Sequence, residues 1–417
     1  MLSEIRDRWY AHVLARKIRS PFVHILFGAR QSGKSTLLRS LLPADAVILD
    51  LSDPSERARY AARPSELIAM CRALPRARKP RVVFVDEAQS VPAIFDAVQS
   101  LYDSDKLRWR FVLCGSSARR LRRTESNLLP GRSFLHRLQA LMLGEQPAAQ
   151  AQTPGIPPVI NMPWPTGKPE RPFPSWSLDD RLAYGALPGV VTARQADRAD
   201  ILRAYAALHI EEEIRRETLI RNWGDFLQFL RFAALSSGSM LNYASISQET
   251  GISQPTVKGY FQLLEDMFIG CRIPAFTRSP RKGLIVTPRF FFFDLGVRNA
   301  AAGLIPSGSM VRANPGPLFE QWVGIELWKR LQYLGEGALS YFRTRSGSEV
   351  DFVIERNQEL TPVETKWTEN PSLRDARGIL AFLEEQPKLA HRGYIVCRCP
   401  RPLQLHEKVM ALPWHCL

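Results

Sequence analysis

The sequence contains no long hydrophobic run. A helix that spans a membrane needs about 18 or more consecutive apolar residues, and no such stretch occurs among the 417 residues. The first residues, Met1 to Trp9, carry charges but lack the apolar centre of a secretory signal peptide. We therefore expect neither a membrane span nor a membrane partner.

Cysteine is scarce and scattered. The chain has only six cysteines, which does not suit the disulfide framework of a small secreted protein and does suit a reducing cytoplasm. Cys397 and Cys399, together with His415 and Cys416, do not follow the spacing of a standard zinc motif. We expect a cytoplasmic protein without a zinc site at these residues.

Acidic residues are fewer than basic ones. The chain has 41 Asp and Glu against 56 Lys and Arg, which gives a formal net charge of +15. Such an excess favours an anionic partner, most commonly nucleic acid. An arginine-rich proteome would produce the same excess without any function, so a DNA partner is one of two interpretations of this charge.

A loop bounded by glycines is the clearest functional signal. The apolar run at 25–27 predicts a buried strand, the pattern G-x-x-x-x-G-K-[ST] follows it, and leucines at helical spacing come next. A phosphate-binding loop requires this order of strand, loop and helix. Glycines let backbone N–H groups surround an anion, and the N-terminus of the helix adds partial positive charge. The residues expected to bind nucleotide are Gly28, Ala29, Arg30, Gln31, Ser32, Gly33, Lys34, Ser35 and Thr36.

Two carboxylates end a later apolar run. Residues 82–85 are all apolar, which predicts a strand buried on both faces, and Asp86 and Glu87 follow directly. The carboxyl ends of parallel strands face the ligand. Lys34 would reach the β- and γ-phosphates, while Ser35 and Asp86 would hold Mg²⁺. Glu87 is placed to polarise the attacking water, so we expect ATP and Mg²⁺ as ligands and ATP hydrolysis as the reaction.

These motifs resemble a known family. The segments G-A-R-Q-S-G-K-S-T, V-F-V-D-E-A-Q, L-C-G-S-S-A-R-R-L and L-L-P-G-R stand in the order found in bacterial and archaeal AAA-type ATPases. A further buried strand is expected from Trp109 onward, and the resemblance implies that Ser116 or Ser117 at its end contacts the γ-phosphate and the water. It also implies that an arginine beyond this strand acts on the γ-phosphate of a neighbouring subunit. Arg132 is the candidate, which would make the protein a homo-oligomer; a solvated basic loop is the alternative.

The middle of the chain predicts a linker and a helix-turn-helix. Prolines recur through residues 146–175, which disfavours helix and sheet and indicates a loop or linker. Residues 241–264 then have the pattern of two helices joined by a turn at Gly251. Gln254, Thr256 and Lys258 on the second helix could meet a DNA groove. The alternative is a winged helix used as a structural lid or a protein interface.

Four polar residues form a second candidate site near the end of the chain. Glu320 belongs to a predicted amphipathic helix, Asp351 to a strand, and Glu364 and Lys366 to one face of a further strand. Two carboxylates that bind Mg²⁺ beside a lysine form the hydrolytic core of phosphodiesterases. The pattern resembles the PD-(D/E)xK nuclease fold. Half-solvated strands with polar faces are the alternative.

Together these patterns predict an α/β chain in three parts. They are a P-loop ATPase domain with a parallel sheet over 1–145, a linker over 146–175, a helical and winged helix-turn-helix domain over 176–285, and a restriction-endonuclease-like α/β domain over 286–417. Three functions follow. The first is an ATPase that acts on DNA or a DNA-bound complex, the second an ATP-regulated DNA nuclease, and the third an ATP-dependent switch whose last domain only binds a protein partner.

Overall fold

The computed structural model describes residues 6–117, 129–149, 170–210, 214–215, 220, 222–277, 287–344 and 347–417. These residues form two compact units. The first contains the chain up to Ala140, and the second contains nearly all of the chain from Leu141 onward. No helix of the described residues is long and apolar enough to cross a membrane.

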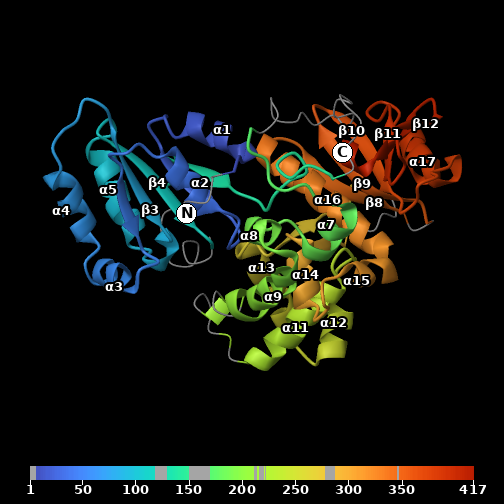
Figure 1. Ribbon diagram of the computed structural model, residues 1–417, viewed down its shortest axis with the longest axis horizontal. Coiled ribbons are helices and arrows are strands. Elements are labelled where there is room, and N and C mark those ends of the chain that lie inside the picture. Colours follow the sequence, from blue (N-terminus) through green and yellow to red (C-terminus); the bar gives the residue numbers. More distant parts are fainter. Residues whose placement is uncertain are drawn as a thin grey trace. The chain divides into compact units, whose positions relative to one another are not determined.

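The first unit is built on a parallel five-stranded sheet (blue to cyan in Figure 1). The strand order is β2-β3-β4-β1-β5, and all neighbouring strands pair in parallel. Every residue of β1 is buried, as expected for a parallel sheet covered on both faces. Its strands are β1 (Val23–Phe27), β2 (Val47–Asp50), β3 (Arg81–Asp86), β4 (Trp109–Gly115) and β5 (Ser133–Arg137). The predicted α/β parallel sheet is thereby confirmed for this region.

Helices surround this sheet and complete its core. α5 packs on β4, α4 packs on α5, and α1 packs on α2. α5 owes its position to Ile94, Phe95, Val98 and Leu101, which recur at helical spacing and are all buried. The helices are α1 (Trp9–Lys17), α2 (Lys34–Leu41), α3 (Pro54–Ala62), α4 (Ser65–Ala73) and α5 (Ile94–Ser104), with a short 3₁₀ turn η1 (Ala88–Ser90) after β3.

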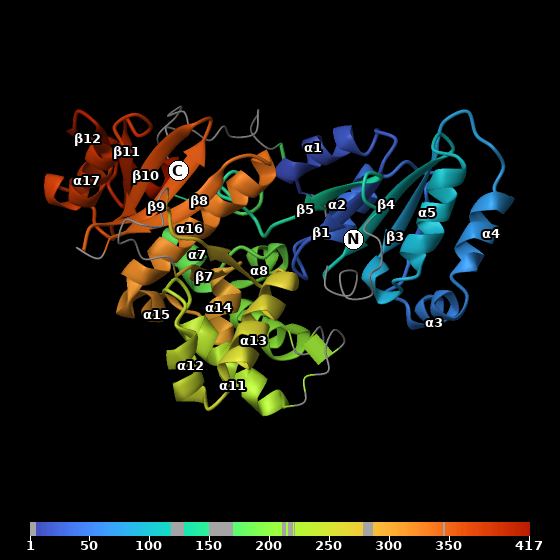
Figure 2. The same ribbon diagram turned by 180° about the vertical axis from the view of Figure 1, so that it is seen from behind.

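The strand order decides where the polar ends of the strands meet. β4 lies between β1 and β3, and β5 lies on the other side of β1 (Figure 2). Because all five strands run the same way, the ends of β1, β3 and β4 lie at one edge of the sheet. Gly28, Asp86 and Gly115 therefore come together there, although they are far apart in the sequence.

The second unit begins with helices and a short strand pair. Gly251, with φ of 71°, ends α12 in the left-handed conformation, and α13 follows three residues later. β6 and β7 pair antiparallel after α13. The elements are α7 (Leu178–Tyr184), α8 (Pro188–Thr192), η2 (Gln195–Asp197), α9 (Arg198–Ala204), the π-helix η3 (Tyr205–His209), α11 (Trp223–Leu235), α12 (Tyr243–Thr250), α13 (Gln254–Asp266), β6 (Gly270–Ile273) and β7 (Arg289–Phe292). The winged-helix interpretation stays a prediction.

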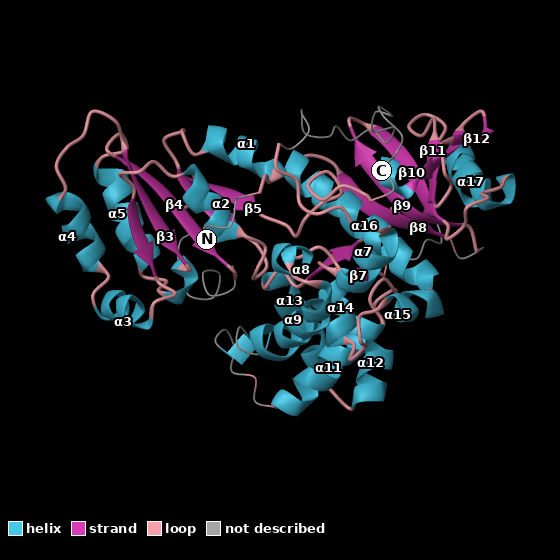
Figure 3. Ribbon diagram, viewed as in Figure 1, coloured by secondary structure: helices cyan, strands magenta, loops and turns pink. Residues whose placement is uncertain are grey.

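A six-stranded mixed sheet ends the chain (Figure 3). Its order is β12-β13-β11-β10-β9-β8; β8, β9 and β10 run antiparallel, while β11 is parallel to β10 and β13. Asn357 and Gln358 both have positive φ and turn β9 into β10, as a two-residue hairpin requires. The elements are α14 (Leu295–Ala301), α15 (Gly308–Ala313), α16 (Pro315–Leu334), β8 (Ala338–Arg343), β9 (Glu349–Arg356), β10 (Glu359–Thr365), η4 (Leu373–Ala376), α17 (Arg377–Glu385), β11 (Gly393–Cys397), β12 (Leu403–His406), β13 (Val409–Pro413) and η5 (Trp414–Cys416).

Alternation along the strands gives this sheet two apolar faces. Phe352 and Ile354 pack in a core with residues of α16, whereas Val353 packs in a core with residues of α17. The core on the α16 side also contains Leu182 of α7 and Phe291 of β7. Residues on both sides of position 286 therefore share one core in the second unit. Separate domains over 176–285 and 286–417 stay a prediction.

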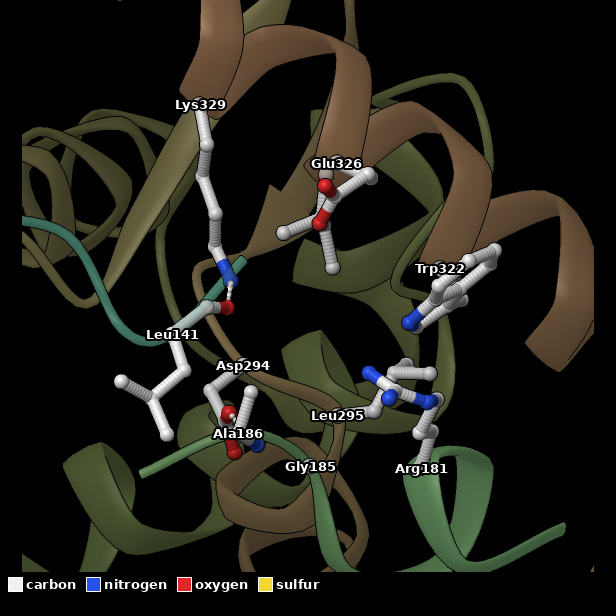
Figure 4. Close-up of a pocket in the computed structure, with 10 residues that line it drawn as sticks. Leu141, Arg181, Gly185, Ala186, Asp294, Leu295, Trp322, Glu326 and Lys329 are labelled. Atoms are coloured by element: carbon white, nitrogen blue, oxygen red, sulfur yellow. Dashed lines mark hydrogen bonds between the residues drawn. The ribbon is translucent and has the colours of Figure 1, made fainter. Parts of the chain in front are cut away.

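Buried charged side chains hold the start of the second unit. Lys329 Nζ donates to Leu141 O at 3.2 Å, and the Leu143 amide donates to Glu326 Oε1 at 2.9 Å. Arg181 donates to the carbonyls of Gln146 and Pro147. Figure 4 shows Lys329, Glu326 and Arg181 around a small cavity. Their partners satisfy charges that would be costly to bury alone. Of the predicted linker, residues 150–169 lie outside the described residues.

Candidate nucleotide-binding site

The loop between β1 and α2 has the backbone that its glycines predict. A Cβ on Gly28 would lie 2.2 Å from the Leu138 carbonyl oxygen, so only glycine fits there. Gly33 has φ of 89° and precedes the first residue of α2. Gln31 also has positive φ, at 58°, which costs a non-glycine residue energy and is common at functional sites.

The lysine and the serine of the motif lie where their roles require. Lys34 is buried, and its Nζ donates to the carbonyls of Gly28 at 2.9 Å and Ala29 at 3.0 Å, which keeps the ammonium at the mouth of the loop. Ser35 Oγ donates to Asp86 Oδ1 at 2.9 Å. The hydroxyl and the carboxylate predicted to hold one Mg²⁺ are thus neighbours.

A buried oxygen in the loop also fits a phosphate ligand. Ser32 is fully buried, and its Oγ has no hydrogen-bond partner among the residues that the structure describes. Buried polar atoms normally find a partner. A phosphate oxygen in the loop would supply one, and the N-terminus of α2 favours such an anion. The residues present therefore fit a nucleotide with Mg²⁺.

Glu87 is held by two neighbours beside these groups. Gln89 Nε2 donates to Glu87 Oε2 at 2.6 Å and to Ser116 Oγ at 3.1 Å, and Ser116 Oγ lies 3.4 Å from the same carboxylate oxygen. Glu87 has φ of 52°, so the chain turns sharply at the end of β3. A Cβ on Gly115 would lie 2.4 Å from Gln89 Oε1, so Gly115 makes room for this amide. The motif carboxylate and the predicted Ser116 are brought together by a glutamine that the sequence did not single out.

We expect a Gln89→Ala variant to lose turnover more than binding. The substitution removes the donor that orients Glu87 and Ser116, and a misplaced base or water-orienting group costs about 10- to 100-fold in rate. The affinity for a fluorescent ATP analogue should change by less than about threefold, because no phosphate contact is removed. Phosphate release and analogue titration measure the two effects. Gln99→Ala on α5 makes the same chemical change elsewhere; an equal loss of rate there would contradict the prediction.

Arg8 is a second residue that sequence reasoning missed. It is buried and donates to the Ser32 carbonyl at 2.6 Å and to the Gln139 carbonyl at 2.7 Å. It therefore ties the phosphate-binding loop to the segment that follows β5. Nothing in the sequence around Arg8 distinguishes it from Arg6, which is exposed.

The structure does not bring Arg132 to the other site residues of its own chain. Ser133 pairs with Val23 at the amino end of β1, so Arg132 lies at the edge of the sheet opposite Lys34. Its Nε donates to Asp103 Oδ1 at 2.7 Å. A role for Arg132 at the nucleotide of a neighbouring subunit stays a prediction.

The proposed DNA-contacting residues lie on α13 with different exposure. Gln254 and Lys258 are exposed, whereas Thr256 is half-buried and its hydroxyl lies 2.8 Å from Ser253 Oγ at the start of the helix. Lys258 Nζ lies 5.4 Å from the ring centroid of Tyr243. Gln254 and Lys258 are therefore accessible to a partner, and Thr256 is mainly part of the helix cap.

The four residues of the second candidate site do come together. Lys366 Nζ donates to Glu364 Oε1 at 2.7 Å, and the Asp351 amide lies 3.4 Å from Glu364 Oε2. Burial and the charge of Asp351 raise the pKa of Glu364 to about 8 and that of Glu320 to about 7. Among the described residues, however, no group of three or more His, Cys, Asp or Glu side chains is arranged to hold a metal ion.

Arg289 is the partner of this cluster that the sequence did not reveal. It is buried, and its two terminal nitrogens donate to Glu320 Oε1 at 2.5 Å and to Glu349 Oε1 at 2.6 Å. Burial lowers the pKa of Arg289, but the carboxylates of Glu320, Asp351 and Glu349 outweigh burial and raise it above its usual value. No spacing rule links residue 289 to 320 or 349.

Three parts of the chain match family models of known proteins. Residues 20–146 match the family model of an AAA domain, residues 175–307 match a domain of unknown function (DUF8612), and residues 315–417 match a further domain of unknown function (DUF4143). Residues 20–146 are thus similar to AAA domains, and this similarity supports ATP binding and an ATPase activity with Mg²⁺.

Two similar proteins align with most of this chain. An uncharacterized protein of Mycobacterium tuberculosis is 24% identical over 395 residues, covering 92% of this chain and 79% of that protein. An uncharacterized protein of Haemophilus influenzae is 21% identical over 388 residues, covering 89% of each. The crystal structure of protein VC1899 from Vibrio cholerae aligns with 91% of this chain and 90% of that chain at 14% identity and a TM-score of 0.16.

Proposed function

We propose that the protein is a Mg²⁺-dependent ATPase that acts on DNA or on a DNA-bound complex. The observation that carries the ATPase part is the meeting of Lys34, Ser35, Asp86 and Glu87 at one edge of the parallel sheet. The AAA-domain match over 20–146 supports the same assignment.

Each of these residues has a defined task in the proposed reaction. Lys34 binds the β- and γ-phosphates from the start of α2, where the helix N-terminus also favours an anion. Ser35 and Asp86 would hold Mg²⁺, which when bound neutralises charge on the phosphates. Glu87 orients and polarises the attacking water, and Gln89 with Ser116 fixes the position of its carboxylate.

DNA as the partner is supported by charge and by one helix. The chain carries a net charge of +15, and Gln254 and Lys258 on α13 are exposed. A contact with phosphates makes binding weaken steeply as salt rises. A homo-oligomer, in which Arg132 reaches the nucleotide of a neighbour, belongs to the same proposal.

Two alternatives remain for the last part of the chain. The proximity of Glu320, Asp351, Glu364 and Lys366 favours an ATP-regulated DNA nuclease. The other alternative is an ATP-dependent switch whose last domain only binds a protein partner. Both keep the ATPase site unchanged.

One experiment separates the three functions. The purified protein is incubated with ATP, Mg²⁺ and supercoiled plasmid at low and high salt, and both phosphate release and plasmid integrity are followed. We expect ATP turnover that plasmid stimulates about threefold or more at low salt and does not stimulate at high salt. Plasmid nicking that an Asp351→Ala variant abolishes would move the assignment to the nuclease. If plasmid does not change ATP turnover and the DNA stays intact, the ATP-dependent switch is the function that remains.

A further inference from the structure

Arg289 is the central cation of the C-terminal carboxylate cluster. It enters from β7, and its guanidinium bridges Glu320 on α16 and Glu349 on β9 at 2.5 and 2.6 Å. Its Cζ also lies 4.8 Å from the ring centroid of Tyr341 on β8. A planar guanidinium matches two carboxylates in this way better than a lysine would.

The other carboxylates of the cluster have partners from the chain itself. Asp351 Oδ2 accepts hydrogen bonds from the Thr365 amide at 2.8 Å and the Thr365 hydroxyl at 2.7 Å. Glu364 accepts from Lys366, and Arg343 lies 3.6 Å from Glu349 Oε2. Three cations of the chain thus face the four carboxylates of Glu320, Glu349, Asp351 and Glu364.

This arrangement does not fit a resident divalent cation. Glu320 is turned to Arg289 and Glu364 to Lys366, and no three carboxylates among the described residues converge as metal ligands do. A guanidinium between Glu320 and Glu349 also repels a second cation placed beside it. The neutralising charge that a nuclease centre takes from Mg²⁺ is supplied here by an arginine.

We propose that Arg289 takes the place of the divalent cation, so that the C-terminal constellation is an arginine-centred ion network and a metal ion enters only when Arg289 is removed. The proposal is independent of the ATPase site. It concerns the regulation of the nuclease-like site alone, since cleavage would require Arg289 to leave Glu320 first.

Thermal unfolding with Mn²⁺ and without nucleotide tests the proposal. Any rise in Tm that Mn²⁺ causes in the wild-type protein should be the same in an Asp351→Asn variant. Arg289→Met should lower Tm by about 5 °C or more, because it removes the buried guanidinium that bridges the half-buried carboxylates of Glu320 and Glu349. Mn²⁺ should restore part of that loss in Arg289→Met but not in the Arg289→Met/Asp351→Asn double variant.

Arg343→Met is the matched control, since Arg343 pairs with Glu349 from a more exposed position. It should neither lower Tm comparably nor create a response to Mn²⁺. Should Arg289→Met fail to fold, Arg289→Lys replaces it, because lysine keeps one positive charge. Mn²⁺ should then raise the Tm of Arg289→Lys slightly, whereas it should not raise the Tm of the wild type through this site.

Two results would overturn the proposal. The first is Mn²⁺ binding to the wild-type protein, seen by electron paramagnetic resonance, that Asp351→Asn removes, because a metal centre would then already exist. The second is a stable Arg289→Met variant that Mn²⁺ leaves unchanged. Neither result depends on plasmid cleavage or ATP turnover, so a failure here is distinct from a failure of the proposed function.

Discussion

A Glu87→Gln variant is expected to bind ATP and to lose nearly all ATP turnover. The amide keeps the size of the side chain and can still pair with Gln89 and Ser116, which now lie 2.6 and 3.4 Å from Glu87 Oε2. It cannot take a proton from the attacking water or polarise it. Removal of a general base typically costs about 10²- to 10⁴-fold, so we expect turnover to fall at least about 100-fold. Phosphate release measures turnover, and a fluorescent ATP analogue measures binding.

Lys34→Ala provides the complementary loss. Its ammonium is the charge that the loop places at the phosphates, so this variant should lose affinity for the analogue as well as turnover.

Glu66→Gln is the matched control for Glu87→Gln, because Glu66 pairs with Arg59 between α3 and α4, away from the loop. A Glu87→Gln enzyme that keeps more than a tenth of the wild-type rate would remove Glu87 from the mechanism.

The first unit is expected to lose stability on mild acidification through two buried histidines. His24 Nδ1 lies 3.0 Å from His136 Nε2, and Tyr10 OH lies 2.8 Å from His136 Nδ1, across β1, β5 and α1. Burial lowers the pKa of His24 to about 4 and that of His136 to about 3. Both rings are therefore neutral in the folded protein at pH values where the unfolded chain is already protonated.

The sign follows from these depressed pKa values. The full stability of the folded protein is present above about pH 6.5, the pKa of a histidine in the unfolded chain. Stability falls as the pH drops below that value, and the loss stops once the pH is below the pKa values of the folded state. At pH 5 each histidine lowers the free energy of unfolding by about 2 kcal/mol relative to neutral pH, and the pair lowers it by about 4 kcal/mol. A His24→Gln/His136→Gln variant cannot titrate, so its Tm should fall less between pH 7.5 and 5 than that of the wild type. Equal falls in both proteins would show that other groups govern acid unfolding.

Much of the first unit could be predicted because its signals are local. The strands expected at 25–27, at 82–85 and from Trp109 onward appear as β1, β3 and β4. The phosphate-binding loop is one continuous segment, and its backbone follows from glycine positions, so spacing alone located Lys34 and Ser35. Asp86 was found because the ends of parallel strands meet at one edge whatever lies between them.

In the second unit the sequence predicted some elements but not how they pack together. The helix expected around Glu320 is present as α16, and Glu364 of β10 lies next to Asp351 of β9. That the helices before β7 share a core with the last sheet was not predictable. An apolar face shows that an element is covered but does not show which element covers it.

The sequence by itself determined the class of the first domain, its nucleotide loop and the order of its polar strand ends. Only the tertiary structure decided the partners of those groups. Gln89 meets Ser116 over 27 residues, Arg8 meets Gln139 over 131, and Arg289 meets Glu349 over 60. Long side chains such as these take whichever partner the packing of the elements brings near. The spacing of residues in the sequence predicts contacts within one turn or one loop, whereas contacts between elements form only when the chain folds.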